Sequence, residues 1–251
     1  DHGIYGALER KADHLAVPKA GKPRQILWRI YSKRSILCAG ASERPIAFEN
    51  NDRPGIMLAG AMRSYANRWA VTASQTVAIF TNNDDGHKTA ADLSALGVTI
   101  SGVVDIRENA PKSDAYEVIP GGKVINTRGR LGLKSIAVVM ADGKLRSLDC
   151  GALGVSGGWN PNIHLTSHHR GRPVWKESIA AFCPAQDGPN GQTVAGAASG
   201  NFSTTDALRS GALKAKEALK ELGFKSTMVD LPKAEDKSIE MTPFWYVGEC
   251  S

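Results

Sequence analysis

The feature that most constrains the fold is a strand–helix–strand pattern between residues 76 and 105. Residues 76–80 form a continuous apolar run that predicts a buried strand, and residues 86–96 have helical spacing, with Leu93 and Leu96 on the face they share with Thr89. Residues 98–104 then predict a second strand that ends at Asp105. Two strands joined by one helix pair in parallel, with a right-handed crossover. Such a unit is half of a dinucleotide-binding domain, so the pattern predicts an α/β fold.

Further strands and two helices are predicted on either side of this unit. The alternation of Ile26, Trp28 and Ile30 with polar neighbours has the period of a strand, and residues 3–10 are predicted to pair with it. Asp142–Gly143 is a strong turn dipeptide and predicts a hairpin. The other predicted strands are residues 35–40, 123–126, 135–140, 145–150, 152–156 and 192–196, and the predicted helices are residues 59–69 and 204–222.

Composition excludes several classes of protein. The 251 residues are 42% apolar and 22% charged, which is typical of a globular chain and not of a disordered one. No apolar run approaches the roughly 18–20 residues of a membrane helix, so no membrane association is expected. The net charge is +6, but Lys and Arg are scattered and do not alternate with aromatic residues, which argues against nucleic-acid binding. The sequence begins without Met or a signal-peptide pattern, and a piece of a longer chain is expected.

Neither a metal site nor a catalytic set is predicted. The four cysteines, Cys38, Cys150, Cys183 and Cys250, are far apart and include no C-x-x-C pair, which favours a reduced, cytoplasmic protein. His164, His168 and His169 have no Glu, Cys or Asp at the spacing of a metal motif, and a surface turn explains them better. No Ser–His–Asp set, G-x-S-x-G elbow or carboxylate pair is found, so no catalytic residue is assigned.

The loop at residues 81–86 lies where a glycine-rich phosphate loop is expected. Against G-x-G-x-x-G it keeps only the third glycine, Gly86, and it adds Asp84 and Asp85. These carboxylates would take the positive end of the helix dipole and repel a phosphate. Asp105 is placed where a ribose-binding acid would be. The sequence therefore favours a relic fold here over a working nucleotide site.

Two other glycines are better placed for a cofactor, because each follows a predicted buried strand. Gly40 ends the first of these strands, and Gly196 ends the second, just before the long helix. Small residues at a strand end that faces a helix N-terminus admit a pyrophosphate or a ribose, although tight packing also explains such residues. The candidate cofactor-binding residues are Ala39, Gly40, Ala41, Gly196, Ala197, Phe202 and Ser203.

The most specific motifs of the chain resemble one family. Residues 37–48 read LCAGASERPIAF, residues 51–62 read NDRPGIMLAGAM, and VSGGWNP and VAGAASGNF follow at residues 155–161 and 194–202. These stretches resemble the α subunit of heterotetrameric sarcosine oxidases, which has A-T-G-A-x-E-R-P and N-D-R-P-G-x-M-L-A-G-A at the first two places. The resemblance spans nearly the whole chain. One departure is Cys38-Ala39-Gly40 in place of Ala-Thr-Gly, which removes a hydroxyl.

The resemblance implies the two-dinucleotide-binding-domain fold of FAD/NAD(P)-binding disulfide reductases, with a parallel sheet and a β-meander, present here only in part. Residues 1–70 and 150–230 would belong to a first, NAD-binding domain, residues 71–149 to an inserted degenerate dinucleotide-binding domain, and residues 231–251 to a linker toward a missing C-terminal domain. The opening G-x-G-x-x-G strand of the family is not in the sequence, so a non-catalytic central fragment is expected.

The resemblance also implies cofactors, partners and a reaction. The α subunit of the family holds a non-covalent NAD, while the β subunit carries FAD and FMN, and γ and δ subunits complete the oxidase. The enzyme oxidatively demethylates sarcosine to glycine with oxygen, which gives hydrogen peroxide and, with tetrahydrofolate bound in a domain absent here, methylene-tetrahydrofolate. Two alternatives stay open: the α subunit of a related D-hydroxyproline or opine dehydrogenase, and a non-catalytic scaffold whose nucleotide sites are both inactive.

Overall fold

The chain forms two compact units in the computed structural model, which describes residues 3–167, 171–185, 188–234 and 241–244. Unit 1 takes residues 1–40, 161–174 and 182–237, and unit 2 takes residues 41–160, 175–181 and 238–251. The expected domains had boundaries at residues 70 and 150, whereas residues 41–70 and 150–160 lie in the same unit as residues 71–149. The physical reason is that these segments supply two strands of the sheet of unit 2 and a helix that packs against that sheet.

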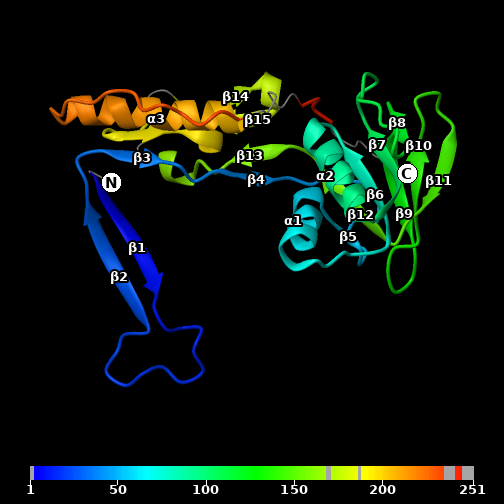
Figure 1. The fold of residues 1–251 in the computed structure, drawn as a ribbon, viewed down its shortest axis with the longest axis horizontal. Coiled ribbons are helices and arrows are strands. Elements are labelled where there is room, and N and C mark those ends of the chain that lie inside the picture. Colours follow the sequence, from blue (N-terminus) through cyan, green and yellow to red (C-terminus); the bar gives the residue numbers. More distant parts are fainter. Residues whose placement is uncertain (1–2, 168–170, 186–187, 235–240, 245–251) are drawn as a thin grey trace. The chain divides into compact units, whose positions relative to one another are not determined.

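Unit 2 is built on a five-stranded sheet whose pairs are all parallel. Its order is β5 (Ile56–Leu58), β12 (Ala152–Ser156), β6 (Thr76–Thr81), β7 (Thr99–Asp105) and β8 (Val118–Pro120). The helices α1 (Ala59–Trp69) and α2 (Asp84–Ala95) connect β5 to β6 and β6 to β7 (Figure 1). The predicted strand–helix–strand unit is therefore confirmed.

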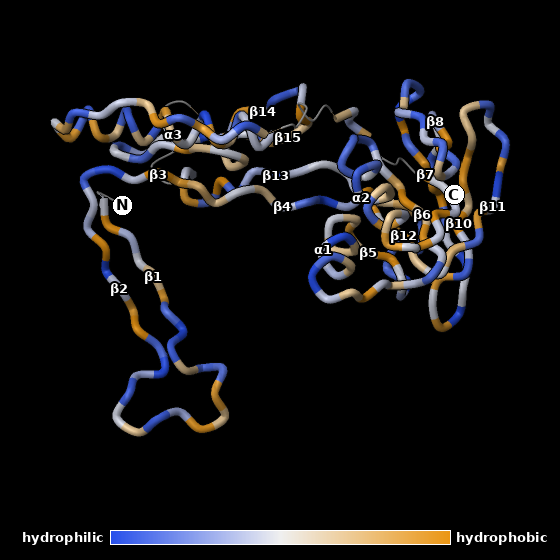
Figure 2. The backbone as a smooth tube through the Cα atoms, in the orientation of Figure 1, coloured by the Kyte–Doolittle hydropathy of each residue, from blue (hydrophilic) through white to orange (hydrophobic). Residues whose placement is uncertain are grey.

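Both faces of this sheet are covered, which explains why its strands are apolar throughout. Val77 and Ile79 pack with residues of α1 and α2, whereas Ala78 and Phe80 pack with the antiparallel sheet of β9 (Lys123–Arg128), β10 (Ser135–Val139) and β11 (Leu145–Asp149). Successive residues of a strand point to opposite faces, so a sheet covered on both sides needs continuous apolar runs. The apolar colouring of β6, β7 and β12 in Figure 2 follows from this. The sheet of β9 to β11 confirms the meander, and β10 and β11 form the predicted hairpin.

Unit 1 contains smaller sheets and one long helix. Strands β1 (Ile4–Arg10) and β2 (Gln25–Tyr31) pair antiparallel, as predicted, and β3 (Ser35–Leu37) pairs in parallel with β16 (Gln192–Val194). A 3₁₀ turn, Gly196–Ser199, follows β16 and leads to α3 (Thr204–Glu221). Other short elements belong to unit 2 or lie at the boundaries between the two units, apart from the 3₁₀ turn His164–Thr166 of unit 1. They are β4 (Ala41–Glu43), β13 (Trp159–Pro161), β14 (Val174–Lys176), β15 (Ala181–Cys183) and the 3₁₀ turn Glu177–Ile179.

Several apolar positions are more exposed than their periodicity predicts. Leu96 is 53% exposed, because α2 ends at Ala95 and Leu96 caps it outside the buried face. Trp28 and Ile30 of β2 are 51% and 47% exposed, and no residue of α3 is buried. The strands β3 and β16 are only half-buried, since each has a single neighbour among the described residues. The apolar surface of unit 1 is therefore only partly covered by the part of the chain that is described.

Candidate functional site

A pocket of unit 1 lies at the carboxyl ends of the parallel strands β3 and β16. Its volume is about 600 Å³, and it is lined by the loops after both strands and by one face of α3. Ligands of parallel α/β sheets bind outside the carboxyl ends of the strands. The lining residues are Cys38, Gly40, Ala195, Gly196, Ala197, Thr204, Ala207, Leu208, Gly211, Ala212, Ala215, Val229 and Leu231.

The two glycines of this pocket are required by their backbone conformation. Gly40 has φ +72° and Gly196 has φ +67°, in the left-handed region that favours glycine. A Cβ added at Gly40 would meet no atom within 4 Å, and one at Gly196 would meet only Ala207 Cβ, at 3.8 Å. The space in front of both glycines is therefore open, so a ligand can approach the backbone there.

The start of α3 is closed by its own side chains. The Ser203 hydroxyl accepts a hydrogen bond from the Asp206 backbone N–H at 3.0 Å and donates to the Asp206 carboxylate at 2.7 Å. This is an N-cap, and the Asp206 carboxylate takes the favourable end of the helix dipole. In the next turn of the helix, the Ser210 hydroxyl accepts a hydrogen bond from the Gly196 backbone N–H at 3.2 Å and ties the strand end to α3. The helix start is thus already provided with a negative charge.

Three of the seven candidate residues line the pocket: Gly40, Gly196 and Ala197. The other candidates, Ala39, Ala41, Phe202 and Ser203, belong to the same loops and helix start but are not among its lining residues. The sequence-based analysis missed the contribution of α3, where Ala207, Gly211 and Ala215 recur every fourth residue. Small residues at that spacing form a groove on one face of a helix, and this signal could have identified it.

The glycine-poor loop of unit 2 is packed tightly. The Asn83 side chain caps α2 by accepting a hydrogen bond from the Asp85 backbone N–H at 2.9 Å, and it is fully buried. A Cβ added at Gly86 would lie 2.9 Å from Thr81 Cγ2 and nearer still to Thr81 Cβ and Oγ1. Gly86 therefore serves the close approach of α2 to β6, the role of the third glycine in the fingerprint.

Asp105, at the end of β7, is occupied by partners from its own chain. Its carboxylate is fully buried and accepts hydrogen bonds from His87 Nε2 at 2.7 Å and from Arg107 Nη2 at 2.7 Å. Arg107 Nη1 also lies 2.8 Å from Asp84 Oδ1. Burial by itself would raise the pKa of Asp105, but the hydrogen bonds from His87 and Arg107 outweigh it and hold that pKa below its usual value.

A C-terminal segment lies across the same end of the sheet. Met241 forms a β-bridge with Asn83, and the Asn82 amide donates to the Thr242 carbonyl at 2.9 Å. The Phe244 ring packs edge-on against Phe80, with 6.3 Å between ring centroids. Residues 241–244 thus pack on unit 2 itself, and the interpretation of residues 231–251 as a linker stays a prediction.

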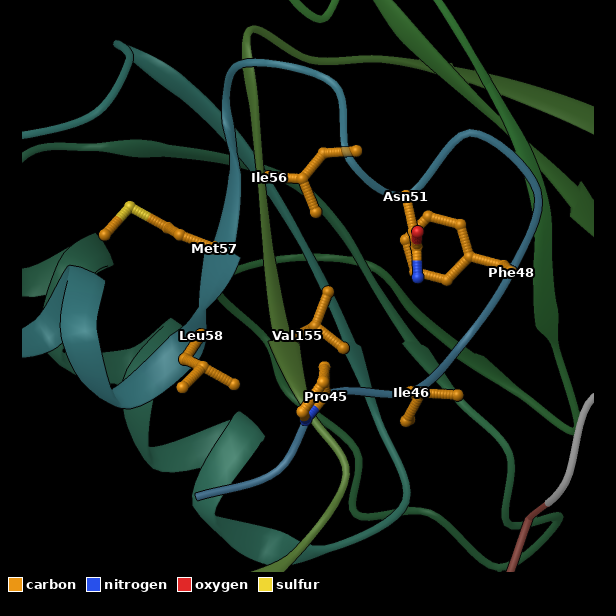
Figure 3. A pocket seen from close by; sticks show the side chains of 8 residues that line it. All are labelled: Pro45, Ile46, Phe48, Asn51, Ile56, Met57, Leu58 and Val155. Atoms are coloured by element: carbon orange, nitrogen blue, oxygen red, sulfur yellow. The ribbon is translucent and has the colours of Figure 1, made fainter. Parts of the chain in front are cut away.

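A second, smaller pocket in unit 2 is apolar. It has a volume of about 220 Å³ and lies between β5, β12 and the loop before β5. Figure 3 shows Ile56, Val155, Pro45 and Ile46 around it, while Met57 points to the other side of the strand. Its one side-chain amide is that of Asn51, so it offers little to a charged cofactor.

The described residues contain no group of three or more His, Cys, Asp or Glu side chains that could hold a metal ion. His168, His169 and Cys250 lie outside the described residues. Cys150 is buried, and burial raises the pKa of its thiol to about 12, so it is not a nucleophile at neutral pH. Within the described part of the chain, no helix is long and apolar enough to cross a membrane.

Comparison with curated proteins finds close relatives for the whole chain. It is 36% identical over 251 residues to sarcosine oxidase subunit alpha of Rhizobium meliloti (strain 1021), and 38% identical over 262 residues to that of Corynebacterium sp. (strain P-1). Each match covers 98% of this chain, and the chain spans 25% and 27% of the two relatives. No family model matches the sequence.

Solved structures of low identity share the fold. L-proline dehydrogenase from P. horikoshii matches 80% of this chain and 37% of its own, with a TM-score of 0.57 and 22% identity. Thioredoxin reductase of Lactococcus lactis matches 78% of this chain and 69% of its own, with a TM-score of 0.60 and 15% identity. At these identities the likeness shows the fold alone, and it confirms the disulfide-reductase-like α/β class.

Proposed function

We propose that this chain, which belongs over nearly its whole length to the family of sarcosine oxidase α subunits, is the segment of such a subunit that carries a non-covalent NAD in unit 1. The observation that supports this most is the pocket of about 600 Å³ at the carboxyl ends of β3 and β16. Its volume is in the range of small-molecule sites, and its place in the sheet is where dinucleotides bind in this class of fold.

The lining of the pocket suits the uncharged parts of a dinucleotide. Gly40 and Gly196 leave open space at the backbone, and Ala207, Gly211 and Ala215 leave room along α3 for a ribose or a flat ring. Ser203 and Asp206 bring a cap and a negative charge to the helix start, which disfavours a phosphate there. We therefore place a ribose and its base against these residues and assign the pyrophosphate to donors outside them. When bound, NAD would supply a hydride acceptor.

The wider activity follows from the family. The complete oxidase would demethylate sarcosine to glycine with oxygen, give hydrogen peroxide and pass the one-carbon unit to tetrahydrofolate, with FAD and FMN in a β subunit and with γ and δ subunits present. This chain would supply binding surface and no catalytic residue. A cytoplasmic location fits the free thiols of Cys38, Cys150 and Cys183.

Unit 2 would hold no dinucleotide. Asp105 is already paired with His87 and Arg107, Gly86 has no space in front of it, and residues 241–244 cover the end of the sheet. A single NAD per chain, bound in unit 1, is expected.

The experiment that tests the site measures NAD in purified protein of natural length, with Gly211→Leu as the variant. Gly211 is helical, and an added Cβ there meets no atom within 4 Å, so leucine would project into the pocket without backbone strain. Gly6→Leu is the matched control, because Gly6 of β1 also has open space and lies outside the pocket. We expect NAD to stay with the wild type and with Gly6→Leu and to be lost from Gly211→Leu.

Equal NAD in both folded variants would reject the unit 1 site. The non-catalytic role has its own test, in which the purified chain is given sarcosine without other subunits. Hydrogen peroxide above the buffer background would contradict it.

A further inference from the structure

Arg44 is a half-buried cation of unit 2 that has only neutral partners. Its Nε donates to the Gly157 carbonyl at 2.7 Å, and its Nη1 donates to the Ala180 carbonyl at 2.6 Å and to Asn160 Oδ1 at 3.1 Å. No carboxylate oxygen of the described residues lies within 4.0 Å of it, and Nη2 has no acceptor there. Burial lowers the pKa of Arg44, and no acidic group offsets that effect.

Arg44 lines a pocket of about 190 Å³ at the carboxyl ends of β6 and β12. Its walls include the apolar residues Ile46, Pro243 and Phe244. Asn82 also lines it, but the Asn82 amide already donates to the Gly157 and Thr242 carbonyls. Among the side chains that line the pocket, Arg44 therefore keeps N–H donors, on Nη2, without an acceptor among the described residues.

The size of this pocket and the chemistry of its lining limit which ligands it can bind. Residues 241–244 lie across this end of the sheet, and 190 Å³ is too small for a dinucleotide but suits a molecule of a few heavy atoms. Nη2, the nitrogen of Arg44 without an acceptor among the described residues, can donate to a carboxylate oxygen, and the apolar side chains of the pocket suit a short hydrocarbon body. Arg44 has no counter-charge in the described part of the chain, and its half-buried surroundings screen charges less than water does. An anionic ligand would therefore bind there more tightly than a neutral ligand of the same shape.

We propose that the pocket beside Arg44 binds a small monocarboxylate, with the carboxylate on the Arg44 guanidinium and a short apolar body against Ile46 and Phe244. This site is separate from the NAD pocket and does not depend on the proposed function.

The test uses saturation-transfer NMR on the purified protein, with propionate as probe and propionamide as its uncharged analogue. We expect a saturable signal for propionate, no signal for propionamide at the same concentration, and at least a tenfold loss of propionate affinity in Arg44→Gln. Arg53→Gln is the matched control, because Arg53 also donates to a backbone carbonyl, that of Gly129, and lines none of the described pockets. Wild-type affinity in Arg44→Gln, or an equal signal from propionamide, would overturn the proposal.

A second variant covers the case in which Arg44→Gln does not fold. Ala47 is an exposed residue on the rim of the pocket and makes none of the hydrogen bonds of Arg44, so Ala47→Leu would fill the space and leave those contacts in place. We expect Ala47→Leu to bind propionate at least tenfold more weakly than wild type. A folded Ala47→Leu protein with wild-type affinity would also reject the site.

Discussion

The variant Asp105→Asn distinguishes two roles for Asp105: stabilising the fold of unit 2, or binding the ribose of a dinucleotide. The Asp105 carboxylate is fully buried and accepts hydrogen bonds from His87 Nε2 and Arg107 Nη2, each at 2.7 Å. Asparagine keeps the shape but removes the negative charge and puts an N–H₂ group against one of these donors. Breaking a buried ion pair from one side costs about 3–5 kcal/mol.

We expect the lower end of that range, because Asp84 Oδ1 stays 2.8 Å from Arg107 Nη1 and keeps part of its counter-charge. A loss of about 3 kcal/mol corresponds to about 6–12 °C in the melting temperature of a protein of this size. The effect depends on pH. Because the folded-state pKa of Asp105 lies below its usual value, its stabilisation is present above the unfolded-state pKa and disappears as the pH falls through the folded value.

The assay is urea unfolding of wild type and Asp105→Asn at pH 7 and at pH 3.5, together with NAD content at pH 7. We expect a lower unfolding midpoint for the variant at pH 7, a smaller gap at pH 3.5 and unchanged NAD per folded protein. Unchanged stability would refute the account of the buried network. Loss of NAD at unchanged stability would show that Asp105 binds the dinucleotide and that unit 2 is not a relic.

Three further predictions rest on other contacts of unit 2. Gly86→Ala should cost about 1–3 kcal/mol in urea unfolding, because its Cβ falls on the Thr81 side chain; a neutral result would mean that α2 shifts freely. Burial raises the pKa of Glu43 despite the hydrogen bond from the Gly60 N–H, so its ionised form destabilises the fold as the pH rises through that pKa. Glu43→Gln should therefore gain stability relative to wild type between pH 4 and pH 7, and a constant difference in unfolding midpoint would contradict this. Cys150, whose pKa is about 12, should react with iodoacetamide only in unfolding concentrations of urea, and peptide mass spectrometry would detect earlier labelling.

Much of the local structure is predictable because it depends on neighbours in sequence. The helix of residues 59–69 has the predicted bounds, and the hairpin at Asp142–Gly143 forms because Gly143 takes φ +81° and its N–H donates to the Met140 carbonyl, which closes a three-residue loop. The end of α3 is also local, since Gly223 follows it with φ +83°. Leu96 shows the limit of such reasoning. Helical spacing places it on the buried face with Leu93, but it lies just past the end of α2 and is exposed.

The long-range pairings could not be predicted from the sequence. The two strands of the candidate site, β3 and β16, are separated by more than half of the chain, and each is too short to carry a strong pattern. Residues 241–244 pack across one end of the sheet of unit 2 through contacts of Met241 with Asn83 and of Phe244 with Phe80. These contacts join residues far apart in the sequence, so no local periodicity predicts them. Gly40 and Gly196 could be proposed from the sequence because small residues at the end of a strand leave room for a ligand at the backbone, and both line the pocket of unit 1.

The central claim is that NAD binds in the unit 1 pocket, and the most direct test uses Cys38, a native cysteine of that pocket, as a reporter. Cys38 is exposed and lines the pocket, whereas Cys150 and Cys183 are buried. The measurement is the rate of Cys38 alkylation by iodoacetamide in purified protein of natural length, with and without saturating NAD, followed by peptide mass spectrometry. The account predicts that bound NAD slows labelling of Cys38 at least tenfold. Stoichiometric NAD together with an unchanged Cys38 rate would show that the dinucleotide binds elsewhere.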